Sequence, residues 1–580
     1  MDKRDVGIKM MALVVAMVMV LSMSIAVFAE GETYKITITA NADNDTHTYE
    51  AYQIMTGDLD TDENSATKGQ LKNLAWGTGV DGATLLNALK SDATIGSKFT
   101  DCDATAPSVA AAMGECTVTA DVEALAAVIG AYVKSAGLSA AGTSSGNVIN
   151  GLAQGYYFVK DVTADTALTY DTKSQFMLQV VGDVTVTAKD STVSVEKKVD
   201  DKNDSTTGED AIAWQDTADY DVNDVIPYML KGTLPSNYAK FDFFDYTFTD
   251  EMCTGLTLNA NSVKVVYYAD EAALAADTTA TGGTDITNQF TITPTANAAG
   301  ATLTVSKVSS WSGEGEEKTL VSAGLKDITA LTADSVIVVY YTATLNENAV
   351  IGATGNENTV TLTFSNNPNA TGDGDNTTTE TPEDTNIVFT YQVDVNKFDE
   401  KNEPLAGATF ALYKEVSDAI TAGAKTGAAI KAELGDDVKA AALGDAKSYV
   451  VVGTIEATKA SGATNYTASF QRVDDGNYVL VETVVPSGYN AWDAKAFTIN
   501  ATHTQDPAEL KLSDLTATGT GIALTGNTAK GSLSTDVVNN SGAVLPSTGG
   551  IGTTIFYIVG AILVVGAGIL LVTRRRMSAN

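Results

Sequence analysis

Apolar and polar residues alternate along much of the chain. The segments YKITIT at 34–39 and TVTLTF at 359–364 place Val, Ile, Leu, Tyr or Phe at every second position. This period of two is typical of half-buried β-strands, whose side chains point to opposite faces in turn. Residues 121–135 begin with a carboxylate and then place apolar residues at helical spacing, and residues 417–443 are rich in Ala and Lys. Both segments are typical of helices. The pattern predicts a mainly β protein with helical insertions.

Two interruptions divide this pattern. It pauses near 188–194 and restarts at Val195, and residues 369–385 are Thr, Gly, Asp, Glu and Asn with almost nothing to bury. We therefore predict domains at 30–190, 191–368 and 386–541, with a linker at 369–385. The phrases GYYF at 155–158 and GNYV at 476–479 are similar. They favour related immunoglobulin-like β-sandwiches in tandem.

The N-terminus predicts export. Lys3, Arg4 and Lys9 precede an apolar stretch from Met10 to about Ile25, and VFA precedes Glu30. A basic region, an apolar region and a small residue in this order are typical of a signal peptide. We predict a signal peptide at 1–29 that is cut after Ala29.

The C-terminus carries three features in a fixed order. A mostly apolar run at 551–573 is about long enough to span a bilayer as one transmembrane helix, and the tail at 574–580 begins with three arginines that predict a cytoplasmic end. The run follows the pentapeptide Leu545, Pro546, Ser547, Thr548 and Gly549. This order resembles the LPxTG sorting signal of Gram-positive surface proteins. The resemblance implies that a sortase cuts after Thr548 and passes its carboxyl group to an amine.

Charge and composition exclude several function classes. The chain has 72 acidic and 36 basic residues and a formal net charge of −36, so its surface repels nucleic acid and anionic lipid. Its two histidines, His47 and His503, lie far apart without ligand spacing. We predict no metal centre, no cofactor and no Ser–His catalysis, whereas catalysis by carboxylates alone stays open.

The three cysteines leave two possibilities open. An exported chain permits a disulfide between Cys102 and Cys116, and it equally permits two free thiols. Cys253 is unpaired in either case.

The third domain contains family phrases from end to end. It opens with VDVNK at 393–397, continues with PLAGATF at 404–410 and YVLVET at 478–483, and closes with VVN at 537–539. These phrases resemble a Cna B-type domain with its pilin E-box. The resemblance implies an intramolecular isopeptide bond between Lys397 and Asn539, with Glu482 as the catalytic acid.

Elementary chemistry explains why such a bond needs these residue types. An ammonium is no nucleophile and a carboxamide is a poor electrophile, so the amine must be neutral and the carbonyl polarised. Burial lowers the pKa of a lysine and raises that of a carboxyl group, which allows Lys397 to be neutral and Glu482 to be protonated. Folding then holds amine and carbonyl together, with effective molarities of about 10⁵ M or more.

The second domain contains a variant of these phrases. It has VEKKV at 195–199, YTFTD at 246–250 and GNENTV at 355–360. They resemble the D2 domain of fimbrial shaft pilins, in which the acid can be Asp. Matching positions assign the trio Lys197, Asp250 and Asn358. Because a shift of one residue moves a side chain to the opposite face of a strand, three alternatives stay open: Lys198, Asp245 and Asn356.

The first domain departs from the pattern. Lys35 stands in its opening strand and Asp161 in the position that corresponds to Glu482, but the closing segment at 183–187 has no Asn. We therefore predict no isopeptide bond there.

Lys189 precedes the second domain at the position where shaft pilins carry a YPKN-like motif. Thr187 and Ala188 replace the Tyr and Pro of that motif. The resemblance implies that Lys189 is the intersubunit lysine, with Lys160, Lys197 and Lys198 as alternatives.

Together the resemblances imply a major pilin that a sortase polymerises head to tail, through Lys189 and Thr548, into cell-wall-anchored fimbriae used in adhesion. The expected partners are pilus-type and housekeeping sortases, identical subunits, an ancillary tip pilin, peptidoglycan and a ligand on a host or bacterial surface. The alternative is an LPxTG adhesin that is anchored to the wall and never polymerised. An exported enzyme is disfavoured because no nucleophile–base pair or metal-ligand cluster emerges from the sequence.

Overall fold

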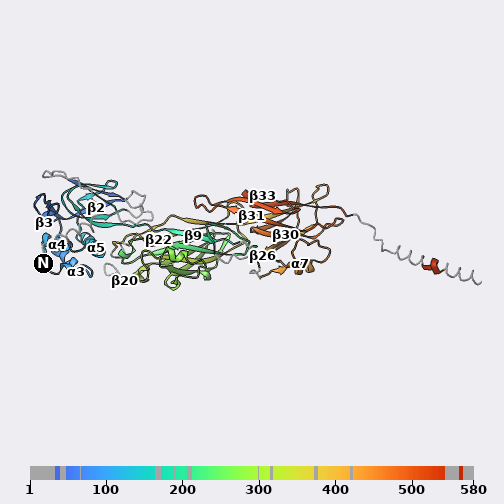
Figure 1. Ribbon diagram of the computed structural model, residues 1–580, viewed down its shortest axis with the longest axis horizontal. Coiled ribbons are helices and arrows are strands. Elements are labelled where there is room, and N and C mark those ends of the chain that lie inside the picture. The colour runs from blue at the N-terminus through green and yellow to red at the C-terminus, as the bar shows by residue number, and fades with distance from the viewer. Residues whose placement is uncertain are drawn as a thin grey trace, which may run out of the picture.

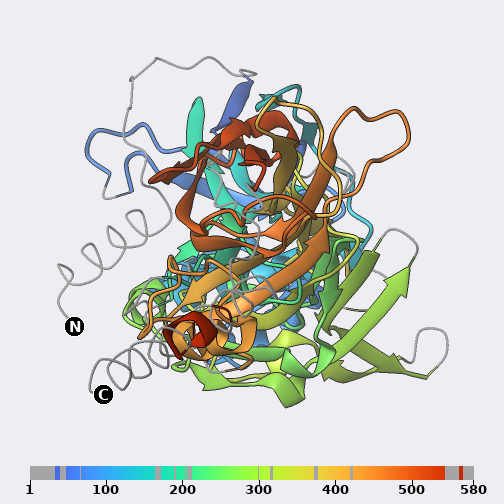
Figure 2. The ribbon, with the colours of Figure 1, turned by 90° about the vertical axis from the view of Figure 1, so that its right-hand side faces the viewer.

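The computed structural model describes residues 33–39, 47–65, 67–163, 172–187, 191–202, 204–205, 212–297, 300–313, 318–370, 372, 376–417, 422–542, 559 and 561–565. Three β modules follow one another along the long axis of an elongated molecule (Figure 1). Viewed down that axis, the modules overlap (Figure 2). This arrangement confirms the predicted mainly β fold of tandem sandwiches with helical insertions.

The first module combines two sheets with four helices. The sheets have the strand orders β5-β1-β8 and β3-β2-β6-β7. Apolar side chains of the helices pack on one face of the second sheet, against Met55, Phe158 and Met177. Its elements are β1 (Tyr34–Thr39), β2 (Tyr49–Leu59), β3 (Leu71–Trp76), α2 (Gly82–Ser91), α3 (Gly96–Phe99), α4 (Ala106–Met113), α5 (Thr119–Ser135), β4 (Gly142–Thr143), β5 (Val148–Leu152), β6 (Gly155–Asp161), β7 (Gln175–Val180) and β8 (Val184–Thr187).

The helix predicted at 121–135 is present as α5, but α2, α3 and α4 were not predicted. Their signals are local: Asp81 caps α2 by accepting hydrogen bonds from the backbone N–H groups of Ala83 and Thr84, and Pro107 stands in the first turn of α4. Each of these helices has at most ten residues, so its apolar period is too short to stand out from the sequence.

The structure resolves the two possibilities for the cysteines in favour of free thiols. Cys102 and Cys116 flank α4 at its two ends, and their Sγ atoms face the carbonyl oxygens of Ser108 and Ala112.

The second module is a sandwich of two large sheets. Their orders are β10-β9-β12-β21-β15-β16, with β14 on β21, and β11-β24-β22-β13-β18-β17, with β23 on β22. A two-stranded ribbon, β19-β20, forms a separate sheet. The elements are β9 (Val195–Asp200), β10 (Trp214–Gln215), β11 (Thr217–Asp219), β12 (Val225–Gly232), β13 (Tyr246–Cys253), β14 (Leu256–Leu258), β15 (Lys264–Tyr268), α6 (Glu271–Ala275), β16 (Thr284–Asp285), β17 (Thr291–Asn297), β18 (Gly300–Lys307), β19 (Ser309–Ser312), β20 (Thr319–Ala323), β21 (Val336–Leu345), β22 (Asn356–Ser365), β23 (Thr378–Glu380) and β24 (Asp384–Phe389).

The predicted linker at 369–385 was wrong. Within the described part of this segment, β23 and the start of β24 pair with β22 and belong to the second module. The polar composition misled the prediction because polar side chains are buried here. Asn386, for example, is fully buried and donates hydrogen bonds to the backbone oxygens of Lys197 and Asp216. The chain crosses to the third module at Thr390 instead.

The third module is a second sandwich, with sheets β29-β25-β34-β33 and β27-β28-β26-β30-β31-β32. The helix predicted at 417–443 forms only over α7 within the described residues, because Gly435 ends it with a positive φ of 80°, which glycine adopts without a side-chain clash. The elements are β25 (Tyr391–Asp399), β26 (Thr409–Val416), β27 (Lys425–Thr426), α7 (Gly427–Leu434), β28 (Ser448–Glu456), β29 (Tyr466–Val473), β30 (Gly476–Val484), β31 (Lys495–His503), β32 (Leu512–Gly519), β33 (Thr525–Asn527) and β34 (Ser532–Asn539).

First and last strands are neighbours in two modules. β1 pairs in parallel with β8, and β25 pairs in parallel with β34. In the third module this pairing places Lys397 opposite Val537 and Asp399 opposite Asn539. The entry and exit strands of the module are therefore joined side by side.

Several predicted features fall outside the described residues. They are the signal peptide at 1–29, Lys189, the LPSTG segment at 545–549 and most of the predicted span at 551–573. Among the residues that the structure does describe, none of the helices combines the length and the apolar character that a membrane crossing requires.

Candidate crosslinking sites

Strand alternation carries three ionisable or amide side chains into the core of the third module. Val393, Val395 and Lys397 occupy alternate positions of β25 that are all buried. The side chain of Lys397 therefore points inward like those of the two valines. Its residue is 0% exposed, and Glu482 on β30 and Asn539 on β34 are each 1% exposed. The sheet that contains Glu482 faces the sheet that contains the other two. The three predicted residues therefore meet in the interior of this sandwich.

The carboxylate of Glu482 is fixed by three hydrogen bonds. Asn539 Nδ2 donates to Oε1 at 2.9 Å and to Oε2 at 3.0 Å, and the backbone N–H of Trp492 donates to Oε2 at 2.9 Å. Lys397 Nζ donates to the backbone oxygens of Phe398 and Val537 at 2.8 and 3.2 Å. Asn539 Oδ1 is buried and has no hydrogen-bond partner among the described residues. A half-turn of the carboxamide would bring that oxygen to Glu482.

Burial shifts both ionisable groups toward their neutral forms. It lowers the pKa of Lys397 to about 8, although Glu482 and Asp399 oppose the shift. Burial also raises the pKa of Glu482, against the hydrogen bonds from Trp492 and Asn539. Burial thus lowers the free-energy cost of exchanging the ion pair for a neutral amine and a carboxylic acid. A neutral amine is a nucleophile, and the acid can donate a hydrogen bond to an amide oxygen.

The second module brings a similar set together across its two sheets. Lys197 lies on β9 in one sheet, while Asp250 on β13 and Asn358 on β22 lie in the other. All three are 0% exposed. Because Met252 pairs with Asn358 and Asp250 pairs with Val360, Asp250 and Asn358 are diagonal neighbours on the inward face.

A tyrosine hydroxyl connects these three side chains. Lys197 Nζ donates to Asp250 Oδ1 and, at 2.9 Å, to Tyr341 Oη. Tyr341 Oη donates to Asp250 Oδ2 at 2.6 Å and accepts from Asn358 Nδ2 at 2.8 Å. Asn358 Oδ1 is buried and lacks a hydrogen-bond partner within the described chain. Amine, acid and amide therefore share one hydroxyl.

Two aromatic rings surround the amine. Tyr228 and Tyr341 face each other across β12 and β21 with centroids 5.2 Å apart, and Lys197 Nζ lies 5.1 and 5.4 Å from the two centroids. Burial lowers the pKa of Lys197, and Asp250 opposes the shift. Burial likewise holds the pKa of Tyr341 well above its usual value. The hydroxyl therefore keeps its proton and can act as donor and acceptor at once.

The sequence did not point to Tyr228 or Tyr341. Both stand at buried positions of alternating strands, where a tyrosine resembles any other core residue. Only their pairing across the two strands, which no local pattern reveals, places them beside Lys197.

The alternatives for the second module lie elsewhere. Lys198 points to the other side of β9, where it forms ion pairs with Asp216 at 2.6 Å and Glu196 at 3.1 Å. Asn356 is buried, but its amide is bonded to backbone groups of Val350 and Val388. Asp245 accepts hydrogen bonds from the backbone N–H of Ser309 and from the side chain of Asn376. None of the three contacts the cluster around Lys197 in these hydrogen bonds.

In the first module the corresponding residues do not meet. Asp161 is fully buried and is hydrogen-bonded to His47 Nδ1 at 2.7 Å and to the backbone N–H of Thr163 at 2.9 Å. The side chain of Lys35 is 49% exposed and forms an ion pair with Asp183 at 3.8 Å. A histidine thus occupies the neighbourhood of the acid in this module.

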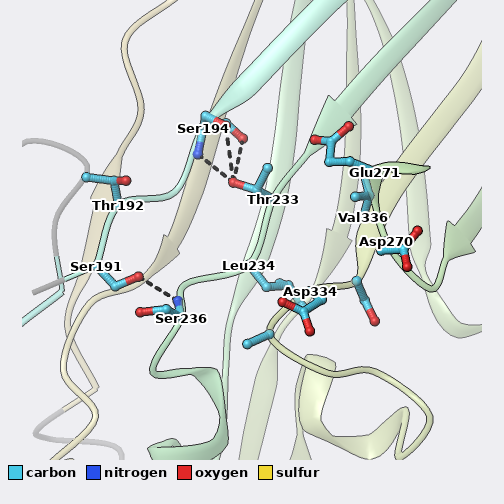
Figure 3. A pocket seen from close by; sticks show the side chains of 12 residues that line it. Ser191, Thr192, Ser194, Thr233, Leu234, Ser236, Asp270, Glu271, Asp334 and Val336 are labelled. Atoms are coloured by element: carbon cyan, nitrogen blue, oxygen red, sulfur yellow. Dashed lines mark hydrogen bonds between the residues drawn. The ribbon is translucent and has the colours of Figure 1, made fainter. Parts of the chain in front are cut away.

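A groove of about 700 Å³ opens beside the first residues of the second module (Figure 3). It is lined by hydroxyl groups, among them Ser194 and Thr233, whose side chains are hydrogen-bonded to each other, and by the carboxylates of Asp270, Glu271 and Asp334. The lining begins at Ser191, two residues after Lys189. Of the alternatives to Lys189, Lys197 is fully buried, Lys198 is ion-paired and Lys160 is half-buried on β6.

Two segments match described families. Residues 391–516 match the SpaA family, a prealbumin-like fold domain, and residues 537–578 match the LPXTG cell wall anchor motif. The first match covers most of the third module, and the second contains Asn539 and the LPSTG segment.

Relatives extend over most of the chain. The trypsin-resistant surface T6 protein of Streptococcus pyogenes serotype M6 is 27% identical over 451 residues, which are 70% of this chain and 72% of that protein. Among solved structures, the T6 backbone pilin of serotype M6 S. pyogenes is 17% identical, with 89% of this chain and 100% of that chain covered and a TM-score of 0.49. The full-length major pilin SpaD of Corynebacterium diphtheriae is 14% identical, with 88% and 97% covered and a TM-score of 0.39.

The geometry of the third module predicts a pH profile for bond formation. The reactive state, neutral Lys397 with protonated Glu482, carries the same number of protons as the ion pair. Its population is therefore constant between the two pKa values and falls outside them. We expect the rate to be level near neutral pH, to fall about tenfold per pH unit above pH 8, and to fall again below the raised pKa of Glu482.

This profile can be measured on Asp250→Ala protein that is made unfolded and then diluted from denaturant into buffers of different pH. Mass spectrometry of quenched samples follows the loss of ammonia in the third module alone. A rate that still climbs above pH 9 would show that a neutral amine suffices and that Glu482 donates no proton.

The second module predicts a role for the Tyr341 hydroxyl. Tyr341→Phe leaves the ring in place but removes the group that contacts Lys197, Asp250 and Asn358, so ammonia loss in this module should slow at least about tenfold. The matched control is Tyr340→Phe, since the adjacent hydroxyl is bonded to Tyr268 on the other face of the sheet. Equal rates in the two variants would rule out a role for the Tyr341 hydroxyl.

Proposed function

We propose that this chain, a structural subunit of a sortase-assembled pilus anchored to the cell wall, is the shaft pilin and is crosslinked internally by two Lys–Asn isopeptide bonds. The observation that carries the proposal is the burial of an amine, an acid and an amide in one cluster in each of two consecutive modules. Its relatives are structural proteins rather than enzymes, and the carboxylates act once, on their own chain.

The bond-forming step is the same in both modules. The neutral lysine Nζ attacks Cγ of the asparagine, a new C–N bond forms, and the former Nδ2 leaves as ammonia. Glu482 first donates a hydrogen bond to the amide directly, whereas Asp250 reaches the amide through the Tyr341 hydroxyl. Each acid then passes a proton from the attacking amine to the leaving nitrogen. One molecule of ammonia is released per bond, and no cofactor takes part.

The two bonds explain how the subunit would resist pulling. In the third module the crosslink joins β25 to β34, so force that enters at one strand leaves by the other without separating the sheets. In the second module it joins the two facing sheets. Each crosslink would also stabilise the fold by about 5 kcal/mol, because it closes a long loop in the unfolded chain.

Polymerisation would use the groove beside the second module. We assign the attacking amine to Lys189 and the acyl carbonyl to Thr548 of the next subunit, whose residues before Thr548 would lie in the groove along its hydroxyl groups (Figure 3). The contact joins different surfaces of identical subunits. Because repeating it does not close the subunits into a ring, it generates a filament. A tip pilin, peptidoglycan and a surface ligand are the further partners that we propose for this filament.

Intact mass tests the internal bonds. The ectodomain of residues 30–542, produced without sortase, should be lighter than its sequence mass by about 34 Da, or about 17 Da per bond. Glu482→Ala and Asp250→Ala should each restore about 17 Da, and the double variant should have the full sequence mass. The control Glu456→Ala removes an exposed carboxylate of β28 and should keep both losses. Full sequence mass in the unmodified ectodomain would refute the internal bonds.

A polymer ladder tests the intersubunit link. In a host that carries the matching sortase, Lys189→Ala should abolish the high-mass ladder in denaturing gels of wall extracts, whereas Lys173→Ala, a lysine of the first module outside the groove, should leave it intact. Loss of the ladder with retention of wall-anchored monomer is the expected pair of results. A ladder that persists in Lys189→Ala would move the link to another lysine, and monomers alone in the unmodified protein would favour the wall-anchored adhesin.

A further inference from the structure

A hydroxyl, an imidazole and a carboxamide meet where the second module contacts the third. Thr217 is the first residue of β11 in the second module, and His503 is the last residue of β31 in the third. Gln505 stands two residues further along, in the turn before β32. Thr217 and His503 are 286 residues apart in the sequence, so the packing of one module on the other brings them together. The cluster therefore spans the junction.

The Thr217 hydroxyl is bonded to a base. Its Oγ1 lies 2.6 Å from His503 Nδ1, and the backbone oxygen of Thr504 at 2.9 Å is a second acceptor for its single proton. Burial lowers the pKa of His503 to about 4, so the ring is neutral at pH 7 and Nδ1 can accept that proton. Thr217 itself is 0% exposed. A hydroxyl beside a neutral imidazole in a site closed to water is an arrangement that activates a nucleophile.

Two acidic side chains of the second module face the other nitrogen of the imidazole. Asp201 Oδ2 lies 3.8 Å from His503 Nε2, and Asp219 Oδ1 lies 3.9 Å from it. When Nδ1 takes up a proton the ring becomes a cation, and negative charge beside Nε2 stabilises that cation. Hydroxyl, imidazole and acid thus follow one another in the order of nucleophile, base and supporting carboxylate.

The carboxamide of Gln505 is held against the same hydroxyl. Its Nε2 donates to Thr217 Oγ1 at 2.9 Å, so the carboxamide carbon lies within about 4.2 Å of that oxygen. Its Oε1 accepts hydrogen bonds from the backbone N–H groups of Asp216 and Thr217 at 2.8 and 3.1 Å. Two backbone donors on one carbonyl oxygen stabilise the negative charge that develops there when the carbon is attacked. The amide is therefore both positioned and polarised as an electrophile.

We propose that Thr217 and Gln505 form an ester bond that joins the second module to the third. Thr217 Oγ1 attacks Cδ of Gln505, a new C–O bond forms, and the C–N bond to Nε2 breaks. His503 Nδ1 takes the proton from the hydroxyl and passes it to Nε2 of Gln505, which lies 3.2 Å away and leaves as ammonia. The step consumes no oxidant, cofactor or second substrate. Gln505 is exposed, which lets the ammonia escape and so opposes the reverse reaction.

The ester would lock the junction between the two modules. The chain crosses between them at Thr390, which is fully buried, and the ester would add a second covalent connection beside this crossing. Because β11 pairs with β24, the strand that leads into the crossing, the bond would prevent the third module from bending away from the second. The reaction needs neither the isopeptide bonds nor polymerisation, so the two proposals can fail separately.

Peptide mapping tests the ester on the ectodomain of residues 30–542, produced without sortase. Trypsin should release the peptide of residues 203–231 joined to that of residues 496–511, about 17 Da lighter than the two together. Mild treatment with hydroxylamine cleaves esters and leaves amides intact, so it should separate the two peptides without opening the isopeptide bonds. Unjoined peptides with an intact Gln505 in the untreated ectodomain would overturn the proposal.

Variants of the cluster test the role of each group. Thr217→Val removes the hydroxyl and should abolish the joined peptide, whereas Thr217→Ser keeps a hydroxyl and should retain it. In protein made unfolded and diluted from denaturant, His503→Gln should slow the appearance of the joined peptide at least about tenfold, because the base is lost. The matched control is Thr502→Val, which removes the hydroxyl of an exposed residue of β31 and should leave the ester unchanged.

Intact mass adds an independent readout. The ester is a third loss of about 17 Da, in addition to about 34 Da from the isopeptide bonds, so the masses expected from the isopeptide bonds alone are those of the Thr217→Val background. A circular dichroism spectrum like that of the unmodified ectodomain shows that a variant has folded. A joined peptide in Thr217→Val, its absence from folded Thr217→Ser, or an equal rate in His503→Gln would each contradict the proposed reaction.

Discussion

The structure depends on the placement of an amine and a carboxyl group inside a dry β-sandwich. A charged lysine in such a core is strongly disfavoured unless a partner compensates its charge or it gives up its proton. Lys197 and Lys397 are both fully buried, and each lies in a cluster with an acid and an amide whose oxygen has no hydrogen-bond partner among the residues that the structure describes. This instability of the unreacted state would favour the proposed reaction, in which the amine and the carboxamide form one new amide bond and release ammonia.

The two clusters solve this problem in different ways. In the third module the acid holds the amide directly, and the lysine is bonded to backbone oxygens. In the second module the lysine contacts the acid, and the Tyr341 hydroxyl connects both to the amide. The difference follows from topology. In the third module the lysine and the amide lie on neighbouring strands of one sheet and the acid lies in the facing sheet, whereas in the second module the lysine lies in one sheet and the acid and the amide lie in the other.

The same constraint extends to the junction between the modules. The chain crosses at a single buried residue, Thr390, and polar contacts such as Lys414 with Asp221 fasten the two sides. The elongated shape in Figure 1 and the junction without a free linker together describe a stiff rod, which the proposed internal crosslinks would stiffen further. Such a rod suits a subunit that transmits force along a filament anchored in the cell wall.

Local pattern in the sequence determined the β character of the chain and the order of features at its C-terminus, and family phrases indicated Lys397, Glu482 and Asn539, whereas the choice between Lys197 and Lys198 stayed open. These are properties of period and order that a linear chain already contains. Tertiary structure alone decided that residues 378–380 and 384–389 form strands rather than a linker, that Tyr341 joins the second cluster, and that carboxylates from two modules meet at their junction. The reason is physical: burial and pairing between distant strands set the environment of a side chain, and a local sequence window contains only one of the partners.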